Sequence, residues 1–199
     1  MMEAADAAWC ESAAVRDHLN PFLEWLLHRQ AAQGGLTELR VIGKGVQSAI
    51  VGPDDLGDIA EQLAPHVGVA NIYFGINPVE PSQHERHPLR PCRSAVKDGE
   101  VRAYSLLAID VDPVRSDRRG SAAVEEKASA LEVAARVQDW LTRIGAPPIV
   151  ADSGNGYHLL VPLVPVTGDD VPQAARDAQT LLRLLDERFS TPSAKIDRS

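Results

Sequence analysis

The chain has 199 residues, of which 44% are hydrophobic and 24% are charged, a composition that suits a globular protein with one sizeable core or two small subdomains. The formal net charge of -8 at pH 7 argues against nucleic-acid binding over the whole surface, because phosphate binding needs local clusters of Lys and Arg. Neither an apolar run of roughly 20 residues that would span a bilayer nor a secretion signal is present, so the sequence predicts a cytoplasmic protein with no membrane partner.

The N-terminal half predicts helices and short strands. Residues 1–35 are expected to form a helical segment, with a helix that begins near Pro21 and ends at Gly34 and Gly35. Asp54 is the expected N-cap of a second helix. In chain order we expect a strand pair around a Gly-Lys-Gly turn, that second helix and a third strand, at residues 37–43 with 47–51, 53–66 and 69–78.

The polar segment from Pro78 to Glu100 predicts a long, basic surface loop. It contains His84, His87 and Cys92, but no fourth ligand stands at zinc-finger spacing, so zinc is not expected there. The arginines of this loop, and those that follow the next strand, are interpreted as solvated surface clusters: Arg86, Arg90 and Arg93, then Arg115, Arg118 and Arg119.

The C-terminal half begins with a strand over residues 101–112, whose uninterrupted apolar centre indicates burial on both faces. A long helix over 122–145 follows, with an expected buried stripe at Val124, Ala128, Leu131, Ala135, Leu141 and Ile144. Two short strands around a glycine turn (148–164), a helix (169–189) and the start of a last strand (193–199) then predict a mixed α/β chain of the α+β class.

Two carboxylates stand at the end of the apolar strand LLAIDVDPVR. Because side chains i and i+2 of a strand share a face, Asp110 and Asp112 are expected to point the same way. Paired hard oxygen ligands suit Mg²⁺ or Mn²⁺, which proteins often hold with one or two carboxylates and substrate phosphates. The alternative is a strand that has reached the surface, where two aspartates merely begin the next turn.

The segment DSGNGYH suggests a phosphate-binding turn. Gly154 and Gly156 would let the backbone approach a ligand or form an anion-binding nest of amides, while Ser153 and His158 can donate to phosphate oxygens. The alternative is a plain β-hairpin in which Asn155 and Gly156 form a type I′ turn. A carboxylate pair and a phosphate-binding turn in one small domain would together make a metal-nucleotide site.

A family resemblance is carried by several segments, which are, in chain order, ELRVIG, NIYFGINPV, LLAIDVDPVR, SGNGYHLLVPL and KID. With these segments the chain resembles the primase-polymerase branch of the archaeo-eukaryotic primase superfamily, over roughly residues 36–199. The resemblance implies an N-terminal α/β module packed on a module related to the RNA-recognition fold. It also implies that Asp110, Asp112 and Asp197 bind two divalent metal ions, Mg²⁺ or Mn²⁺.

The resemblance further implies that the segment from Ser153 to His158, through Gly154, Asn155 and Gly156, contacts the phosphates of the incoming nucleotide. Arg115 and Lys97 are additional candidates for triphosphate or template contact. In this family the domain extends past the third aspartate, so residues 36–199 are expected to be a catalytic domain truncated at its C-terminal side, with a helicase domain or protein as a partner beyond it.

The expected activity is template-directed nucleotidyl transfer, as a DNA primase, a DNA polymerase or both, on a DNA template and primer strand with nucleoside triphosphates. Two other functional interpretations stay open. One is a catalytically inactive nucleic-acid-binding adaptor with the same fold. The other is a metal-dependent glycosyltransferase, in which an Asp-x-Asp pair also binds a metal ion and a nucleotide sugar.

Overall fold

The computed structural model describes residues 19–117 and 121–198, which divide into two compact units at Ala103 and Tyr104. Both units combine helices with a four-stranded sheet, which confirms the predicted α+β class. None of the helices in the described part of the chain is both long and apolar enough to cross a membrane.

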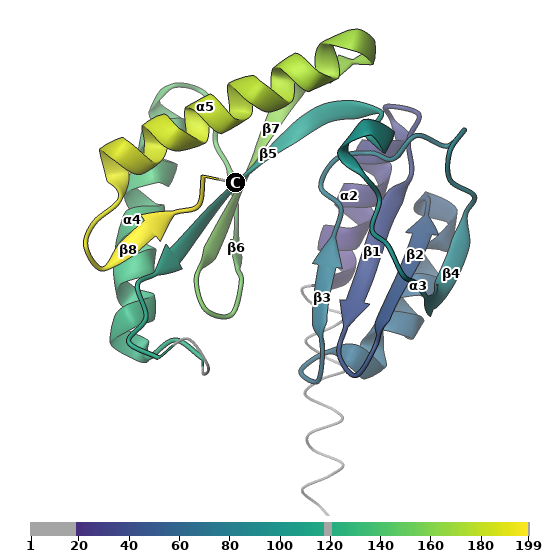
Figure 1. Cartoon of the computed structure of the whole chain (residues 1–199), viewed down its shortest axis with the longest axis horizontal. Helices are drawn as coiled ribbons and strands as arrows, with labels where there is room; N and C mark the ends of the chain where they lie inside the picture. Colours follow the sequence, from purple (N-terminus) through teal and green to yellow (C-terminus); the bar gives the residue numbers. More distant parts are fainter. Residues whose placement is uncertain (1–18, 118–120, 199) are drawn as a thin grey trace, which may run out of the picture. The chain divides into compact units, whose positions relative to one another are not determined.

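The first unit is a sheet in the order β3-β1-β2-β4, with two helices packed on one face (Figure 1). The α2 and α3 helices and the β1 strand contribute Leu23, Ile59 and Leu39 to one buried core. The elements are α2 (Asn20–Ala31), β1 (Thr37–Ile42), β2 (Val46–Val51), α3 (Leu56–Leu63), β3 (Asn71–Phe74) and β4 (His87–Pro91), with single turns of 3-10 helix at Pro53–Asp55, Ala64–His66 and Asp98–Glu100.

Two predictions for this unit are wrong. Residues 78–100 are not loop throughout, because β4 pairs with β2 at the edge of the sheet. Asp54 does not cap α3: the N-cap position is Asp55, whose carboxylate accepts a hydrogen bond from the Gly52 amide at 2.8 Å, while Asp54 lies within the preceding 3-10 turn. That extra turn moves the beginning of the helix by one residue.

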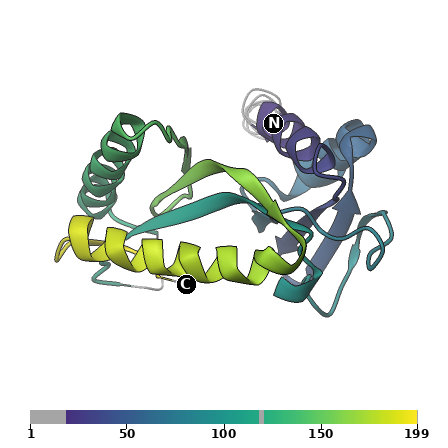
Figure 2. The same ribbon diagram turned by 90° about the horizontal axis from the view of Figure 1, so that it is seen from above.

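The second unit has the element order β5-α4-β6-β7-α5-β8 and the strand order β6-β7-β5-β8. β5 and β7 are long neighbouring strands in both views of the molecule (Figures 1 and 2). The elements are β5 (Ala103–Pro113), α4 (Val124–Arg143), β6 (Ile149–Asp152), β7 (Tyr157–Thr167), α5 (Val171–Phe189) and β8 (Ala194–Ile196), with a turn of 3-10 helix at Gly168–Asp170.

The α4 and α5 helices share one core with one face of this sheet, to which β5 contributes Leu107, Ile109 and Val111. The expected burial of β5 on both faces is confirmed at its apolar centre but does not extend to the end of the strand. On its other face Leu106 is fully buried, but Asp110 is half-buried and Asp112 is exposed. The two aspartates thus lie on the sheet face that the helices leave open.

The predicted buried stripe of α4 is wrong apart from Leu141. Val124, Leu131 and Ile144 are 82%, 48% and 57% exposed. The residues that pack against the sheet are instead Ala130, Val133, Ala134, Val137 and Leu141. Both sets have helical spacing, and the helix buries the face of small and β-branched residues, which lets it lie close to the strands.

Candidate functional site

The second unit brings the three predicted metal ligands together at the adjacent ends of β5 and β8. Val111 pairs with Ile196 in the antiparallel ladder, and the Asp197 amide donates to the carbonyl of Asp110 at 2.9 Å. Residues directly opposite in an antiparallel ladder share a face, so Asp197 lies beside Asp110 on the open face, with Asp112 two residues along β5.

The charges of these carboxylates influence one another. The pKa of Asp112 is raised by partial burial and then by the negative charges of Asp110 and Asp197, while Arg115 and His158 act in the opposite direction. A cation between the carboxylates would relieve this repulsion.

Asp110 provides the clearest sign of a place for a cation. Its Oδ1 atom is buried and has no hydrogen-bond partner among the described residues. In residues 19–117 and 121–198, however, no three His, Cys, Asp or Glu side chains converge into a preformed metal cluster. The donors fit Mg²⁺ or Mn²⁺ by their chemistry, and the carboxylates would have to close around the ion.

His158 lies on the neighbouring strand β7, with its Nε2 atom 3.4 Å from Oδ1 of Asp110. At that distance the contact is an electrostatic attraction rather than a strong hydrogen bond, which is consistent with the unsatisfied Oδ1 atom. Interaction with Asp110 raises the pKa of His158, although burial acts against the shift. The imidazole is therefore biased toward the charged form that would bind an anion.

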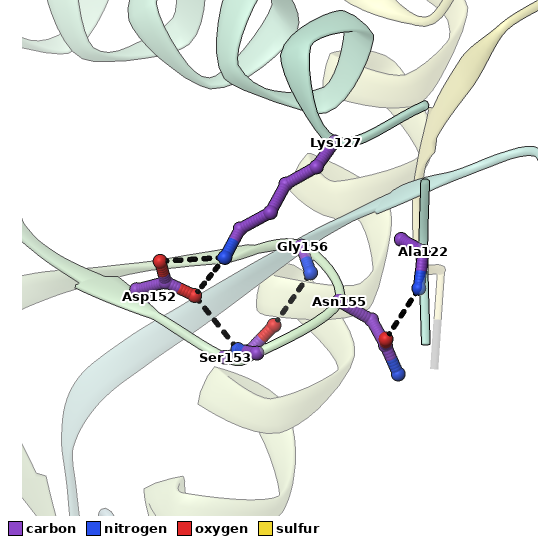
Figure 3. A network of polar contacts seen from close by, with 7 residues as sticks. Ala122, Lys127, Asp152, Ser153, Asn155 and Gly156 are labelled. Atoms are coloured by element: carbon purple, nitrogen blue, oxygen red, sulfur yellow. Dashed lines mark hydrogen bonds and ion pairs between the residues drawn. The ribbon is translucent and has the colours of Figure 1, made fainter. Parts of the chain in front are cut away.

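The loop from Ser153 to Gly156 joins β6 to β7 and is fixed by its own hydrogen bonds. The Gly156 amide donates to Ser153 Oγ at 3.0 Å (Figure 3). The Gly154 amide donates to Oδ1 of Asp152 at 2.8 Å. These two amides are committed, so the expected anion-binding nest is not open at them. Ser153 Oγ acts as an acceptor here, and its hydroxyl proton is still available for donation.

The alternative prediction is correct for the hairpin, because β6 and β7 pair antiparallel across this loop, but wrong for a type I′ turn at Asn155 and Gly156. Such a turn needs positive φ at both residues, whereas Gly154, at φ +92°, is the loop residue with positive φ. Gly156 is required for another reason: a Cβ atom there would lie 2.2 Å from the carbonyl oxygen of Val111 and 3.0 Å from Oδ1 of Asp112. The loop therefore rests directly on the end of β5 that carries the carboxylates.

The Lys127 side chain of α4 and the backbone amide of Ala122, just before the helix, hold this loop in place (Figure 3). Lys127 Nζ donates to both carboxylate oxygens of Asp152, at 2.8 and 2.7 Å. The Ala122 amide donates to Oδ1 of Asn155 at 2.9 Å. Asn155, predicted to contact nucleotide, thus uses its amide oxygen to anchor the chain before α4.

A cavity of about 540 Å³ opens beside the carboxylates, lined by Asp112, Pro113, Val114, Arg115, Lys195 and Asp197. It contains two of the predicted metal ligands and the predicted phosphate contact Arg115, whereas Ser153 and His158 are not part of its lining. The sequence-based reasoning missed Lys195. The alternation in AKID was the available signal, because it places Lys195 on the same strand face as Asp197.

The other polar residues singled out in the sequence lie in the first unit or outside the described residues. The Lys97 amide donates to Glu100, and His84 lies 3.2 Å from the same carboxylate. The arginine cluster of the 78–100 segment is partly neutralised, because Arg86 forms an ion pair with Asp55 at 2.7 Å. Arg118 and Arg119 lie outside the described residues.

No protein-family model matches the chain, and no curated protein and no solved structure matches it significantly.

Proposed function

We propose that this protein catalyses template-directed nucleotidyl transfer from nucleoside triphosphates, as a DNA primase, a DNA polymerase or both. The observation that carries the proposal is the grouping of Asp110, Asp112 and Asp197 on one open sheet face, next to His158 and to a cavity with two basic side chains. Acidic ligands for metal ions and basic groups for phosphates are the two requirements of a metal-nucleotide site.

The topology of the second unit supports the finer fold assignment within this proposal. Its β-α-β-β-α-β order, with β5 and β7 as the central strands, is the split β-α-β arrangement to which RNA-recognition modules belong. Such modules leave one face of a four-stranded sheet open for ligands, and in this chain the open face carries the acidic residues.

In the proposed site, Asp110, Asp112 and Asp197 would hold two Mg²⁺ or Mn²⁺ ions. The chemistry supplied by this site would be charge stabilisation at the attacking 3′-hydroxyl oxygen and at the leaving pyrophosphate. His158, biased toward its charged form, donates a hydrogen bond to a phosphate oxygen, and the Ser153 hydroxyl can do the same. Gly156 permits the close approach of loop and strand that keeps these donors near the carboxylates.

The DNA template and primer strand would be the macromolecular partners, and a helicase domain or protein is the proposed functional partner. With an overall charge of -8, contacts to DNA have to be local. The protein would act in the cytoplasm.

Primer extension with the Asp110→Asn, Asp112→Asn double variant tests the proposal. These substitutions keep the side-chain volume and remove the charge, so extension in Mg²⁺ or Mn²⁺ should fall at least about a thousandfold. Asp169→Asn, which changes an exposed aspartate of the 3-10 turn before α5, is the matched control and should extend normally. Undiminished extension by the double variant would refute the assignment of the metal ligands.

A nucleic-acid-binding adaptor is the second candidate, since no preformed three-residue metal cluster exists in the described part of the chain. An adaptor predicts DNA binding that weakens with salt and is indifferent to EDTA and to nucleotide. Measurement of DNA affinity with and without EDTA, on the wild type and the double variant, separates the two functions.

A further inference from the structure

We propose that Lys195 binds the polyphosphate chain of the incoming nucleoside triphosphate in the cavity beside the carboxylates. The inference rests on the proposed function and adds to it a residue, a contact and a ligand group. Lys195 is the central residue of β8, between Ala194 and Ile196, which are buried in the core shared with the helices. Strand alternation directs its side chain to the open face.

The strand register places Lys195 within the acidic group. It stands directly opposite Asp112 in the β5-β8 ladder, two residues from Asp197, and all three line the cavity. Arg115 is the other basic residue of the lining. The cavity therefore combines two carboxylates with two cations, a charge pattern that complements a divalent cation bound to a polyphosphate. Its volume of about 540 Å³ lies in the range of small-molecule sites.

The ammonium group of Lys195 has no partner in the part of the chain that the structure describes. Within the described residues it forms neither an ion pair nor a side-chain hydrogen bond, although it faces Asp112 across the ladder. Lys127 in the same unit is the contrast, because its Nζ atom binds both oxygens of Asp152. A cation that lies at a fixed strand position in a cavity, without a partner among residues 19–117 and 121–198, is available to a ligand anion.

The nearby carboxylates define which anion can bind there. Without a bound cation, the negative charges of Asp112 and Asp197 would repel a free phosphate. The ligand should therefore be a phosphate chain that binds together with a divalent cation. Nucleoside triphosphate and inorganic polyphosphate share this chemistry. The test therefore uses both, with a nucleoside monophosphate as a probe that lacks the chain.

Calorimetric titration in Mn²⁺ compares the wild type with Lys195→Met, Lys195→Arg and the control Lys44→Met, which changes an exposed lysine of the β1-β2 turn. Lys195→Met should weaken the binding of nucleoside triphosphate and of inorganic tripolyphosphate about tenfold, the loss expected for a charge-assisted contact at a partly open site. Lys195→Arg should keep most of the affinity, and Lys44→Met should keep all of it. Nucleoside monophosphate should bind equally to the wild type and Lys195→Met.

Three results would overturn the inference. If the wild type binds triphosphate and Lys195→Met binds it equally well, Lys195 is not a phosphate ligand, while the proposed function stands. If Mn²⁺ alone, without nucleotide, binds the wild type and Lys195→Met with a difference of the same size, Lys195 acts on the carboxylates instead. If the wild type binds no triphosphate, the proposed function fails and this inference fails with it.

Discussion

Replacement of Gly156 by alanine tests the closest contact of the candidate site. The added methyl group would lie 2.2 Å from the carbonyl oxygen of Val111 and 3.0 Å from Oδ1 of Asp112. Ordinary contact needs about 3.5 Å, so the loop or the end of β5 has to move by about 1 Å. The nearest atom belongs to the backbone, so a simple change of side-chain rotamer cannot relieve the clash.

The expected cost follows from this overlap. Overpacking of this kind typically costs about 1 to 3 kcal/mol of unfolding free energy. Gly154→Ala is a matched control in the same loop: no atom lies within 4 Å of the added methyl group, but φ is +92°, so the cost is conformational and about 1 to 2 kcal/mol. The two variants should therefore lose similar stability for different reasons.

The two variants should lose similar stability but differ in the activity of the site. Urea unfolding gives the free energies, and Mn²⁺ titration and primer extension report on the carboxylates. Because a displacement of about 1 Å can cost roughly a hundredfold in activity, Gly156→Ala should impair extension far more than Gly154→Ala does. If Gly156→Ala is within about 0.5 kcal/mol of the wild type, the close approach of loop and strand is refuted. If both variants extend equally well, the loop does not control the position of Asp112.

Substitutions at three further positions test other parts of the fold. Arg198 donates through Nε to the buried carboxylate of Asp186 at 2.5 Å. Arg198→Ala should lower the free energy of unfolding by about 1 to 3 kcal/mol, as measured with urea. Arg198→Lys should lower it less, because lysine keeps the charge but not the planar donor group. Lys127→Met removes the ion pair with the half-exposed Asp152. It should leave the urea midpoint nearly unchanged, because exposed ion pairs add little stability, but accelerate hydrogen exchange of the loop amides. The pKa of Glu38 is raised from 4.5 by burial, so its contribution to stability is present below that value and is lost as pH rises through the folded pKa. Glu38→Gln should therefore stabilise the protein near neutral pH but not in acid, as measured by urea unfolding at both; an equal effect at both would contradict the raised pKa.

Patterns of neighbouring residues in the sequence were sufficient to predict much of the candidate site. Period-two alternation placed Asp110 and Asp112 on one face, and the Gly-Lys-Gly turn predicted the antiparallel pairing of β1 with β2. Asp197 is different, because no local pattern relates it to β5. Only the family resemblance nominated it, and the ladder between β5 and β8 then places it beside Asp110.

The errors come from information that is not local. β4 contains Pro88 and Pro91, which cannot donate to a ladder and are tolerated because this strand lies at the sheet edge. The sequence does not reveal that edge position, so the prolines suggested a loop. In α4, apolar residues recur with helical spacing on two faces. The face that packs against the sheet contains Val133 and Val137, whereas the face with Leu131 is exposed. Lys195 was missed because its importance depends on the residue opposite to it.

The electrostatics of the open face connect stability with the proposed function. The pKa of Asp112 is raised by burial and by the neighbouring carboxylates, and one buried oxygen atom of Asp110 has no hydrogen bond to any described residue. Both features cost folding free energy, and a bound cation would offset them. A cation that binds only the folded state stabilises it by about 2.7 kcal/mol at a hundred times its dissociation constant. Mn²⁺ should therefore raise the urea midpoint of the wild type, whereas the Asp110→Asn, Asp112→Asn double variant should be more stable without metal and insensitive to it. If Mn²⁺ stabilised the wild type and the double variant equally, the cation would bind elsewhere, and the carboxylates would have to be explained as part of an exposed strand end.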